Sequence, residues 1–235
     1  MKFTKTHGEG NMKGVRKSIK DLYEVRPIPF SYAKGWCLKR HYARRIPTRP
    51  IISFGLFTKP GNMLVGVCVF ADIANPFEPK EWNPFPLLEL SRLIVEEELP
   101  KNTTSFFVGQ CLNKIPKPKV IISYADLGMN HYGYIYQATN WIFTGFSKGG
   151  MPIYIMKDGR ELHHRHYKRY IKHPSDIKAI KKTSPKARYY YFCANKKDKK
   201  EMMKILKSRY PILPYPKGES IRYDANYKKS EFQLF

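Results

Sequence analysis

The chain has 235 residues, enough for one α/β domain with extensions and for a core that needs no disulfide or structural metal. An apolar content of 42% with 14% aromatic residues excludes a wholly disordered chain. Lys and Arg number 43 against 19 Asp and Glu, a net charge of +24, which favours a polyanionic partner, most commonly nucleic acid.

This charge is unevenly spread along the chain. Residues 1–49 hold 13 basic and 3 acidic residues, residues 50–156 hold 8 of each, and residues 157–235 hold 22 basic and 8 acidic. The distribution predicts a neutral chemical core between two basic arms that face a polyanion. A protein that binds nucleic acid only non-specifically would carry the same total charge.

The cysteines and the apolar runs indicate the compartment. The 4 cysteines are widely spaced without a C-x-x-C pair, so we expect neither a disulfide framework nor a zinc ribbon, and a reducing cytoplasm. No apolar run approaches the roughly 20 residues that a membrane helix needs. The polar N-terminus also lacks the apolar stretch of a signal peptide, so we expect no membrane partner.

The first part of the chain predicts an arm, a helix and a hairpin. Residues 1–29 are expected to form a flexible basic N-terminal arm. Apolar and aromatic residues spaced three and four apart predict a helix over 30–45, ended by Pro47. Strand-like runs at 51–57 and 64–70 flank a Pro-Gly-Asn turn signal and predict an antiparallel hairpin.

The middle of the chain predicts a βαβα unit. Alternation over 87–95 indicates a strand, and an N-capped helix follows from about residue 103. Residues 120–124 predict the next strand, 131–140 have helical spacing, and 141–157 are expected to form a hairpin. This order predicts an α/β (α+β) fold with a mixed central sheet and helices on both faces.

The last third differs in composition. A basic insertion rich in His and Tyr is expected at about 158–187, followed by a strand at 188–193 and a Lys-rich helix at 195–208. We expect a single catalytic domain over 30–217 that includes this insertion. Residues 218–235 would form a C-terminal tail.

Two places could hold an anion. The helix start at Thr103, Thr104 and Ser105 offers N–H groups and the positive end of the helix dipole, although ordinary capping is the commoner role. The segment also lacks the glycines of a phosphate-loop motif. Arg92 stands within an apolar strand and needs either a ligand or a structural partner such as Glu89.

Candidate acid–base groups lie at element ends. Asp126 follows a buried-looking strand and precedes a Gly turn, where a carboxylate is a base, a metal ligand or an Asx-turn residue. Tyr136 on the next helix either packs or donates a proton. His41 and Tyr42 at the end of the first helix can act as base or ligands, or be structural.

The basic arms supply candidate DNA contacts. Their aromatic residues are interleaved with basic ones, a mixture that suits phosphate contact and base stacking, and an enzyme acting on a base usually flips it from the duplex. The histidines of the insertion lie among basic residues, which favours phosphate contact or a solvated face over metal binding. The candidate DNA-binding residues are Arg44, Arg45, Arg165, Lys168 and Arg169.

Several long segments resemble the Mom family of phage DNA-modification proteins. They are RHYARRIP (40–47), LLELSRLIV (87–95), PKNTTSFFVGQCL (100–112), VIISYADLGMNHYGYIYQATNWIFTG (120–145) and ARYYYFCANKKDKKEMMKILKSRYPILPYPK (187–217). The S-Y-A-D…G-x-I-Y-Q-A-T-N-W spacing is long and specific. The resemblance implies a fold like that of the GNAT acetyltransferases, in agreement with the element order.

The same resemblance implies conversion of adenine in double-stranded DNA to N6-carbamoylmethyladenine, which protects phage DNA from restriction enzymes in the host cytoplasm. The implied catalytic residues, which are also the candidate ligands of an iron ion, are His41, Tyr42, Asp126 and Tyr136. Arg92 and Ser105, with Thr104, would hold an acyl donor such as acetyl-CoA. The segment NTTSFFVG departs from the Gly-rich pyrophosphate loop of the acetyltransferases.

Other classes remain open at this point. A conventional acetyltransferase would act on an amine of a protein or small molecule, against which the charge of +24 argues. A non-catalytic DNA-binding protein would show salt-dependent binding without any change in nucleoside mass. The Pro-rich and Tyr-rich surfaces also leave a homodimer open.

Overall fold

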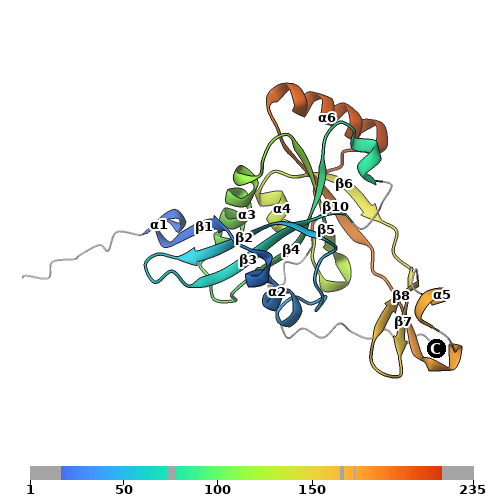
Figure 1. Cartoon of the computed structure of the whole chain (residues 1–235). Helices are drawn as coiled ribbons and strands as arrows, with labels where there is room; N and C mark the ends of the chain where they lie inside the picture. The colour runs from blue at the N-terminus through green and yellow to red at the C-terminus, as the bar shows by residue number, and fades with distance from the viewer. Residues whose placement is uncertain (1–16, 74–77, 165–166, 172, 219–235) are drawn as a thin grey trace, which may run out of the picture.

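A seven-stranded mixed sheet forms the centre of the molecule, and helices cover both of its faces (Figure 1). The computed structural model describes residues 17–73, 78–164, 167–171 and 173–218. In spatial order the strands are β1 (Tyr23–Pro27), β2 (Pro50–Thr58), β3 (Leu64–Ala71), β4 (Leu87–Val95), β5 (Lys119–Asp126), β10 (Lys186–Cys193) and β6 (Ile142–Ser147). The predicted mixed α/β architecture is confirmed.

The sheet opens between β4 and β5. Among the described strands these two pair in parallel, whereas every other neighbouring pair of this sheet is antiparallel. Pairing of β4 with β5 covers 87–89 and 120–122 and then stops, although both strands continue. The carbonyl of Leu90, just past the last pair, accepts a hydrogen bond from Ser123 Oγ at 2.8 Å. The carboxyl halves of the two strands therefore diverge at the edge where α/β folds bind ligands.

One face of the sheet is covered by α3 (Thr103–Lys114), with α1 (Ile19–Leu22) and α4 (Tyr134–Ala138) beside it. The buried apolar residues of α3 recur on one side of the helix, as in an amphipathic helix. They are Phe107, Val108, Cys111 and Leu112. Burial of each large apolar side chain contributes about 1.5–3 kcal/mol, so this side fixes α3 against the sheet.

The opposite face is covered by α2 (Phe30–Lys39) and α6 (Lys196–Arg209), with the short 3-10 helix η1 (Glu78–Trp82) beside α6. Cys37 of α2 lies in a buried cluster with Val67, Val69 and Ile94 from β3 and β4. α6 buries Met202 and Leu206 in a second cluster that contains Trp82. The carboxyl edge of β4 and β5 therefore lies close to the end of α2.

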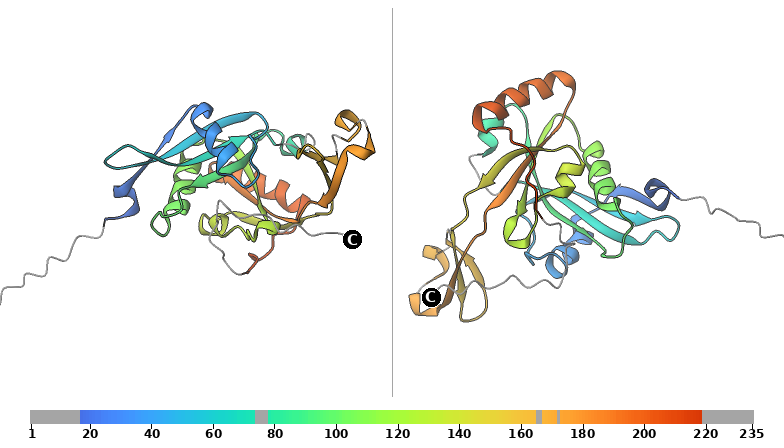
Figure 2. Two further views of the ribbon diagram at one scale, coloured as in Figure 1. Left: turned by 90° about the horizontal axis from the view of Figure 1, so that it is seen from below. Right: turned by 180° about the vertical axis from the view of Figure 1, so that it is seen from behind.

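A small second sheet is inserted between β6 and β10. It contains β7 (Pro152–Met156), β8 (Glu161–His163) and β9 (Ile177–Lys182), in the spatial order β8-β7-β9, with α5 (Tyr167–Tyr170) and the 3-10 helix η4 (Pro174–Asp176). We call residues 151–185 the β7–β9 module. It projects from the main sheet in all the views of Figures 1 and 2.

The sequence prediction of a hairpin over 141–157 is wrong. β6 pairs with β10 in the main sheet, whereas β7 pairs with β8 and β9 in the module. Gly150 has φ +88 and Gly149 lies against the backbone of Pro185 and Thr183, so the chain leaves the main sheet at this point. The module therefore begins before the insertion expected at 158–187.

The N-terminal boundary also differs from the sequence prediction. Residues 1–16 lie outside the described part of the chain, but Tyr23 and Val25 of β1 are buried and pair with Thr58 and Leu56 of β2. The predicted arm over 1–29 therefore overlaps the sheet. The first long helix, expected over 30–45, ends at Lys39, and no helix of the described chain is long and apolar enough to cross a bilayer.

Candidate functional site

Polar side chains from distant segments meet at the carboxyl edge of β4 and β5. They come from the turn after α2, from β4, from the end of β5 and from the segment that leads into α4. We call this group the polar cluster, and its members are His41, Tyr42, Arg92, Asp126, His131 and Tyr136. The structure thus brings together the four candidate catalytic residues that the family resemblance implied.

The turn after α2 fixes His41 and Tyr42. The amides of Arg40 and His41 both donate to the carbonyl of Trp36, and Arg44 then adopts the left-handed conformation with φ 43, which ends the helix. The amide of Ala43 donates to His41 Nδ1 at 3.1 Å. Because Nδ1 accepts this bond, neutral His41 carries its proton on Nε2 and presents a donor there.

His41 is held in its neutral form. Burial, followed by the positive charge of Arg92, lowers the pKa of His41 to about 3. Its ring lies 4.3 Å from the ring of Tyr42, centroid to centroid, and the ring of His131 meets Tyr42 edge-on at 5.9 Å. Burial and then the Asp126 carboxylate raise the pKa of Tyr42, so this phenol stays protonated. His41 therefore suits hydrogen-bond donation better than proton abstraction.

A β-bulge in β4 turns Arg92 toward α2. Val69 pairs with Arg92 and Phe70 with Leu90, so Ser91 is the extra residue on β4. Leu90 packs in the core beneath α3, whereas Ile94, beyond the bulge, packs in the cluster with α2. The bulge therefore places Arg92 on the α2 side, where a bulge-free strand would have turned it toward α3.

Arg92 is 9% exposed and makes its hydrogen bonds with neutral groups. Its Nε donates to the carbonyl of Arg45 at 3.2 Å, and Nη1 donates to the carbonyl and the hydroxyl of Ser91 at 2.6 and 3.1 Å. Arg92 takes part in none of the ion pairs between described residues, although the negative charge of Glu89 favours its positive form. A buried guanidinium with neutral partners suits an anionic or carbonyl-bearing ligand.

Asp126 is 4% exposed and is anchored by its own turn. Its Oδ1 accepts hydrogen bonds from the amide of Gly128 at 3.0 Å and from the hydroxyl of Ser184 in the module. Its carbonyl accepts a bond from the amide of His131 at 3.1 Å. The Asx-turn interpretation and the functional one therefore both apply, because the turn orients the carboxylate within the polar cluster.

Tyr136 lies where β4 and β5 diverge. Its hydroxyl is 2.7 Å from Ser123 Oγ, and Ser123 gives its single proton to the carbonyl of Leu90. Tyr136 must therefore donate its own proton to Ser123 Oγ. Burial raises the pKa of Tyr136, which keeps the phenol protonated. The oxygen of the Tyr136 hydroxyl can therefore accept a further hydrogen bond, whereas its proton is already donated to Ser123 Oγ.

This donor arrangement does not fit the predicted iron site. His41 Nδ1 and Asp126 Oδ1 are occupied by protein hydrogen bonds, and burial disfavours the phenolate forms of Tyr42 and Tyr136 that would bind a hard cation. Across the described ranges, no three His, Cys, Asp or Glu side chains are grouped to hold a metal ion.

The N-terminus of α3 offers a separate anion site. Thr103 is 1% exposed and its hydroxyl has no hydrogen-bond partner among the described residues, while Ser105 Oγ donates to the carbonyl of Asn102 at 3.0 Å. The first-turn amides of a helix have no intrahelical acceptors, so Thr104 and Ser105 fit a phosphate of an acyl donor. Arg92, predicted to share this role, instead lies in the polar cluster.

The predicted DNA contacts divide between two places. Arg44 and Arg45 are exposed in the turn beside His41. Arg169 is exposed on α5 of the module, with its guanidinium 5.3 Å from the ring centroid of Tyr170. Lys168 also belongs to α5, whereas Arg165 lies outside the described residues.

Sequence reasoning missed His131, Ser123 and Ser184. A helix was expected from 131, but Gly133 has φ +80 and α4 begins only at Tyr134, which leaves His131 in the preceding turn. The Asn130 and Gly133 pair is a turn signal that would have identified this. Ser184 has no local signal, because its contact with Asp126 joins segments 58 residues apart.

Two surface hollows lie elsewhere. One of about 500 Å³ is lined by Lys80, Asn83, Pro84, Phe85 and Pro86. Another of about 400 Å³, at the outer end of the module, includes Lys157, Arg160 and His173 in its lining. Neither contains a member of the polar cluster, so the site is defined by its buried polar groups.

Comparison with known proteins gives a family and a set of similar folds. Residues 22–217 match the model of the Mom protein family. The methylcarbamoylase Mom of Escherichia phage Mu is 29% identical over 114 residues, which cover 45% of this chain and 46% of that protein. The match therefore spans about half the length of this curated relative.

Several solved structures that match this chain are acetyltransferases. A GNAT family acetyltransferase from Elizabethkingia anophelis with acetyl-CoA bound is 13% identical, with a TM-score of 0.42 over 73% of this chain and 99% of that one. An IAA acetyltransferase from Bacillus cereus is 12% identical, with a TM-score of 0.43 over 72% and 99%. The ribosomal-protein-S5-alanine acetyltransferase from Vibrio fischeri is 12% identical, with a TM-score of 0.43 over 72% and 92%.

Proposed function

This chain belongs to the Mom protein family, and we propose that it is a transferase that converts adenine in double-stranded DNA to N6-carbamoylmethyladenine. The proposal rests above all on the polar cluster, in which a carboxylate, a neutral histidine and a buried guanidinium meet where β4 and β5 diverge. The net charge of +24 supports a DNA substrate, since it raises the local concentration of a polyanion.

The reaction requires a base near the exocyclic amine. A bond forms between adenine N6 and the methylene carbon of a donor that already carries the carbamoyl group. The bond from this carbon to its leaving group breaks with the electron pair going to the leaving group, and one N6 proton leaves. Asp126 is the group that accepts this proton, because its carboxylate is oriented by the amide of Gly128 and the hydroxyl of Ser184. Neutral His41 donates from Nε2 to a ring nitrogen of the flipped base, which holds the amine toward Asp126.

The donor extends from the start of α3 into the opening, with its reactive end at the polar cluster. Thr104 and Ser105 at the start of α3 bind a phosphate of the donor, such as a phosphate of a coenzyme A derivative. Arg92 binds the carbonyl or carboxylate end of the transferred group and stabilises negative charge that develops there. When bound, the donor supplies the electrophilic carbon.

Nucleoside mass spectrometry tests this function. DNA from cells that express the chain should contain a new adenine species with the mass of the carbamoylmethyl product, absent from cells with an empty vector. An acetylated adenine would indicate ordinary acyl transfer, which leaves a carbonyl carbon rather than a methylene on N6. Unmodified adenine beside acetylated protein or small-molecule amines would replace the proposal with a conventional acetyltransferase.

A further inference from the structure

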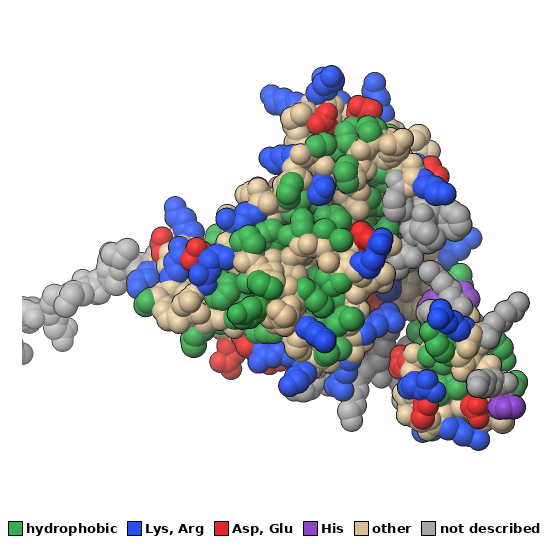
Figure 3. All heavy atoms as spheres, viewed as in Figure 1, with side chains coloured by type: hydrophobic (Ala, Val, Ile, Leu, Met, Phe, Trp, Pro, Cys, Tyr) green, Lys and Arg blue, Asp and Glu red, His purple; other side chains and the backbone are tan. Residues whose placement is uncertain are grey.

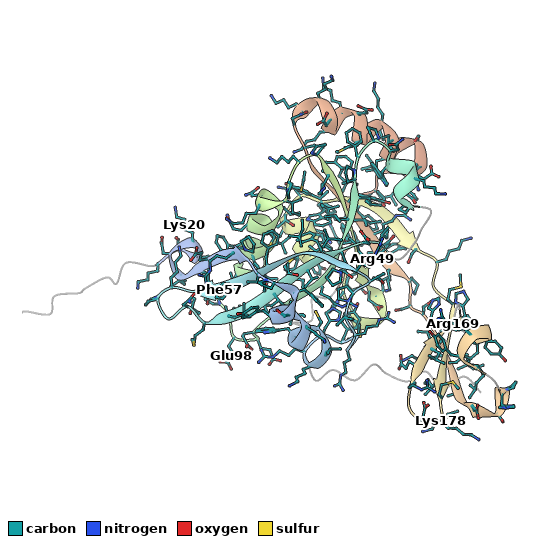
Figure 4. All side chains as sticks on the ribbon, in the orientation of Figure 1. Lys20, Arg49, Phe57, Glu98, Arg169 and Lys178 are labelled. Carbon is teal, nitrogen blue, oxygen red and sulfur yellow. The ribbon has the colours of Figure 1, made fainter. Side chains whose placement is uncertain are left out.

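In its described residues, the β7–β9 module is a separate unit that projects from the main sheet. Met156 and Ile171 are buried within it, and the rings of Tyr154 on β7 and Tyr167 on α5 pack with centroids 4.9 Å apart. Residues 151–185 contain nine basic and three acidic residues. Figure 4 shows Arg169 and Lys178 on this unit, away from the body of the molecule. The module is therefore a packed, basic projection.

Its neck runs directly into the polar cluster. Thr183 and Met151 form the two sides of the neck: the amide of Thr183 donates to the carbonyl of Met151 at 2.9 Å, and the amide of Met151 donates to Thr183 Oγ1 at 3.0 Å. The next residue, Ser184, donates to the Asp126 carboxylate, and the carbonyl of Pro185 accepts from the amide of Leu127 at 3.2 Å. The neck of the module is thus connected to Asp126 and its turn by direct hydrogen bonds.

Strand β9 has two chemically different faces. Lys178, Ile180 and Lys182 of β9 are all exposed, with Lys178 the extra residue of a β-bulge between Ile177 and Ala179, and neither lysine forms an ion pair within the described part of the chain. Lys181 points to the other face and is paired with Glu161 on β8. The edge strand therefore presents two lysine charges that the protein itself leaves uncompensated.

We propose that Lys178 and Lys182 of β9 bind phosphates of the target duplex, so that the module fixes how DNA lies across the polar cluster. This rests on the proposed function and adds to it the surface that positions the substrate. Four residues of strand span about 13 Å, which corresponds to the axial rise of about four phosphates on one DNA strand. The chain then continues through the neck to Lys186, whose positive charge helps to lower the pKa of His41.

The two lysines could also serve a purpose other than phosphate binding, and DNA could bind elsewhere on the protein. Exposed lysines on an edge strand prevent sheet-to-sheet aggregation without binding anything. The Lys-rich helix α6, at the top of Figure 3 and remote from the module, is a competing DNA surface. Each of these two possibilities predicts a different outcome for the variants below.

The experiment measures the dissociation constant for a short adenine-containing duplex as a function of salt. The test variant is Lys178→Gln with Lys182→Gln, and the matched control is Lys181→Gln with Lys200→Gln, which removes the same charge from the opposite face of β9 and from α6. We expect the test variant to lower the salt slope by about 2, one for each lost phosphate contact, and the control to leave it unchanged. Lys178→Arg with Lys182→Arg should retain wild-type binding.

Equal losses in the test and control variants, or a larger loss in the control, would overturn the proposal. So would a test variant that aggregates on gel filtration but binds DNA with the wild-type salt slope. The binding assay involves no chemistry and is therefore separate from the proposed function. If wild-type protein leaves adenine unmodified while the test variant alone loses salt-dependent binding, the proposed function fails and the DNA-binding role of the module stands.

Discussion

The hydroxyl of Ser184 donates a hydrogen bond to the carboxylate of Asp126, and this bond joins the neck of the β7–β9 module to the end of β5 across 58 residues of sequence. The same carboxylate oxygen accepts from the amide of Gly128. The geometry of the proposed base thus depends on both its own turn and a segment that arrives from the module. DNA binding on the module and proton transfer at Asp126 are linked through this contact.

Replacing Ser184 with Ala should therefore reduce modification while the fold persists. Loss of a hydrogen bond to a charged group costs about 1.5–3 kcal/mol in full, and the bond from Gly128 keeps the carboxylate partly oriented. We expect DNA modification to fall while binding to the duplex stays near wild type. Ser175→Ala in η4 of the same module is the control, and equal effects of the two variants on modification would contradict the link.

The neutral state of His41 predicts a stability that depends on pH. Its folded pKa of about 3 lies below the ordinary value of 6.5, so the unfolded chain takes up a proton first as the pH falls. The stabilisation that neutral His41 contributes to the folded state is complete above pH 6.5. Below this pH the free energy of unfolding falls by up to about 1.4 kcal/mol per pH unit, until the folded pKa of His41 is reached. His41→Asn keeps an acceptor for the amide of Ala43 but cannot titrate.

Urea unfolding of the wild type and of His41→Asn at pH 7.5 and at pH 5.5, two values chosen at about one unit on either side of the ordinary pKa, measures this effect. The wild type should lose more free energy of unfolding between the two than the variant does. Parallel losses would mean that His41 is not held neutral in the folded protein.

Replacement by Ala should have opposite effects on the stability of the protein at two of its glycines. A Cβ at Gly133 would clash with the ring of Tyr189, and its φ of +80 disfavours any L side chain, so Gly133→Ala should destabilise the protein by about 1–3 kcal/mol. Gly109 lies within α3, and a methyl group added there would meet nothing within 4 Å, so Gly109→Ala should stabilise the protein by about 0.5–1 kcal/mol. Thermal unfolding measures both, and shifts of the same sign would contradict the packing around α4.

Variants of Tyr136 and of its hydrogen-bond partner Ser123 test the role of the Tyr136 hydroxyl. Tyr136→Phe removes the proton that the phenol donates, and leaves Ser123 bonded to the carbonyl of Leu90. Ser123→Ala removes both bonds and leaves the Leu90 carbonyl without this donor. If Tyr136 only supports the opening between β4 and β5, the activity of Tyr136→Phe in DNA modification should stay within about tenfold of the wild type. A loss of activity by about 10²–10⁴-fold, typical of a proton-transfer group, would show that Tyr136 takes part in the reaction directly.

The sequence predicted the parts of the fold that depend on local pattern. The alternation over 87–95 and the capped helix that follows it correspond to β4 and α3. The hairpin at 141–157 was wrong because pairing of β6 with β10 is a long-range choice that no local turn signal reports. β1 was missed because its five residues lie in a polar, basic stretch, and only burial of Tyr23 and Val25 against β2 makes it a strand.

The same division holds for the candidate site. His41, Tyr42, Asp126 and Tyr136 were chosen from the sequence, and the structure gathers them. The face of Arg92 was not predictable, since it depends on the bulge at Ser91, which is a property of the pairing with β3. Nor was the contact of Ser184, because a hydroxyl near the end of an insertion gives no sequence signal of the carboxylate it will meet.

The central claim is that Asp126 accepts the N6 proton in a DNA-modifying reaction. Its most direct test is nucleoside mass spectrometry of DNA from cells expressing either the wild type or Asp126→Asn, which keeps an oxygen for Gly128 and Ser184 but cannot take up a proton. We predict a carbamoylmethylated adenine with the wild type and a loss of about 10²-fold or more with folded, DNA-binding Asp126→Asn protein. Equal amounts of modified adenine from the two proteins would contradict the account.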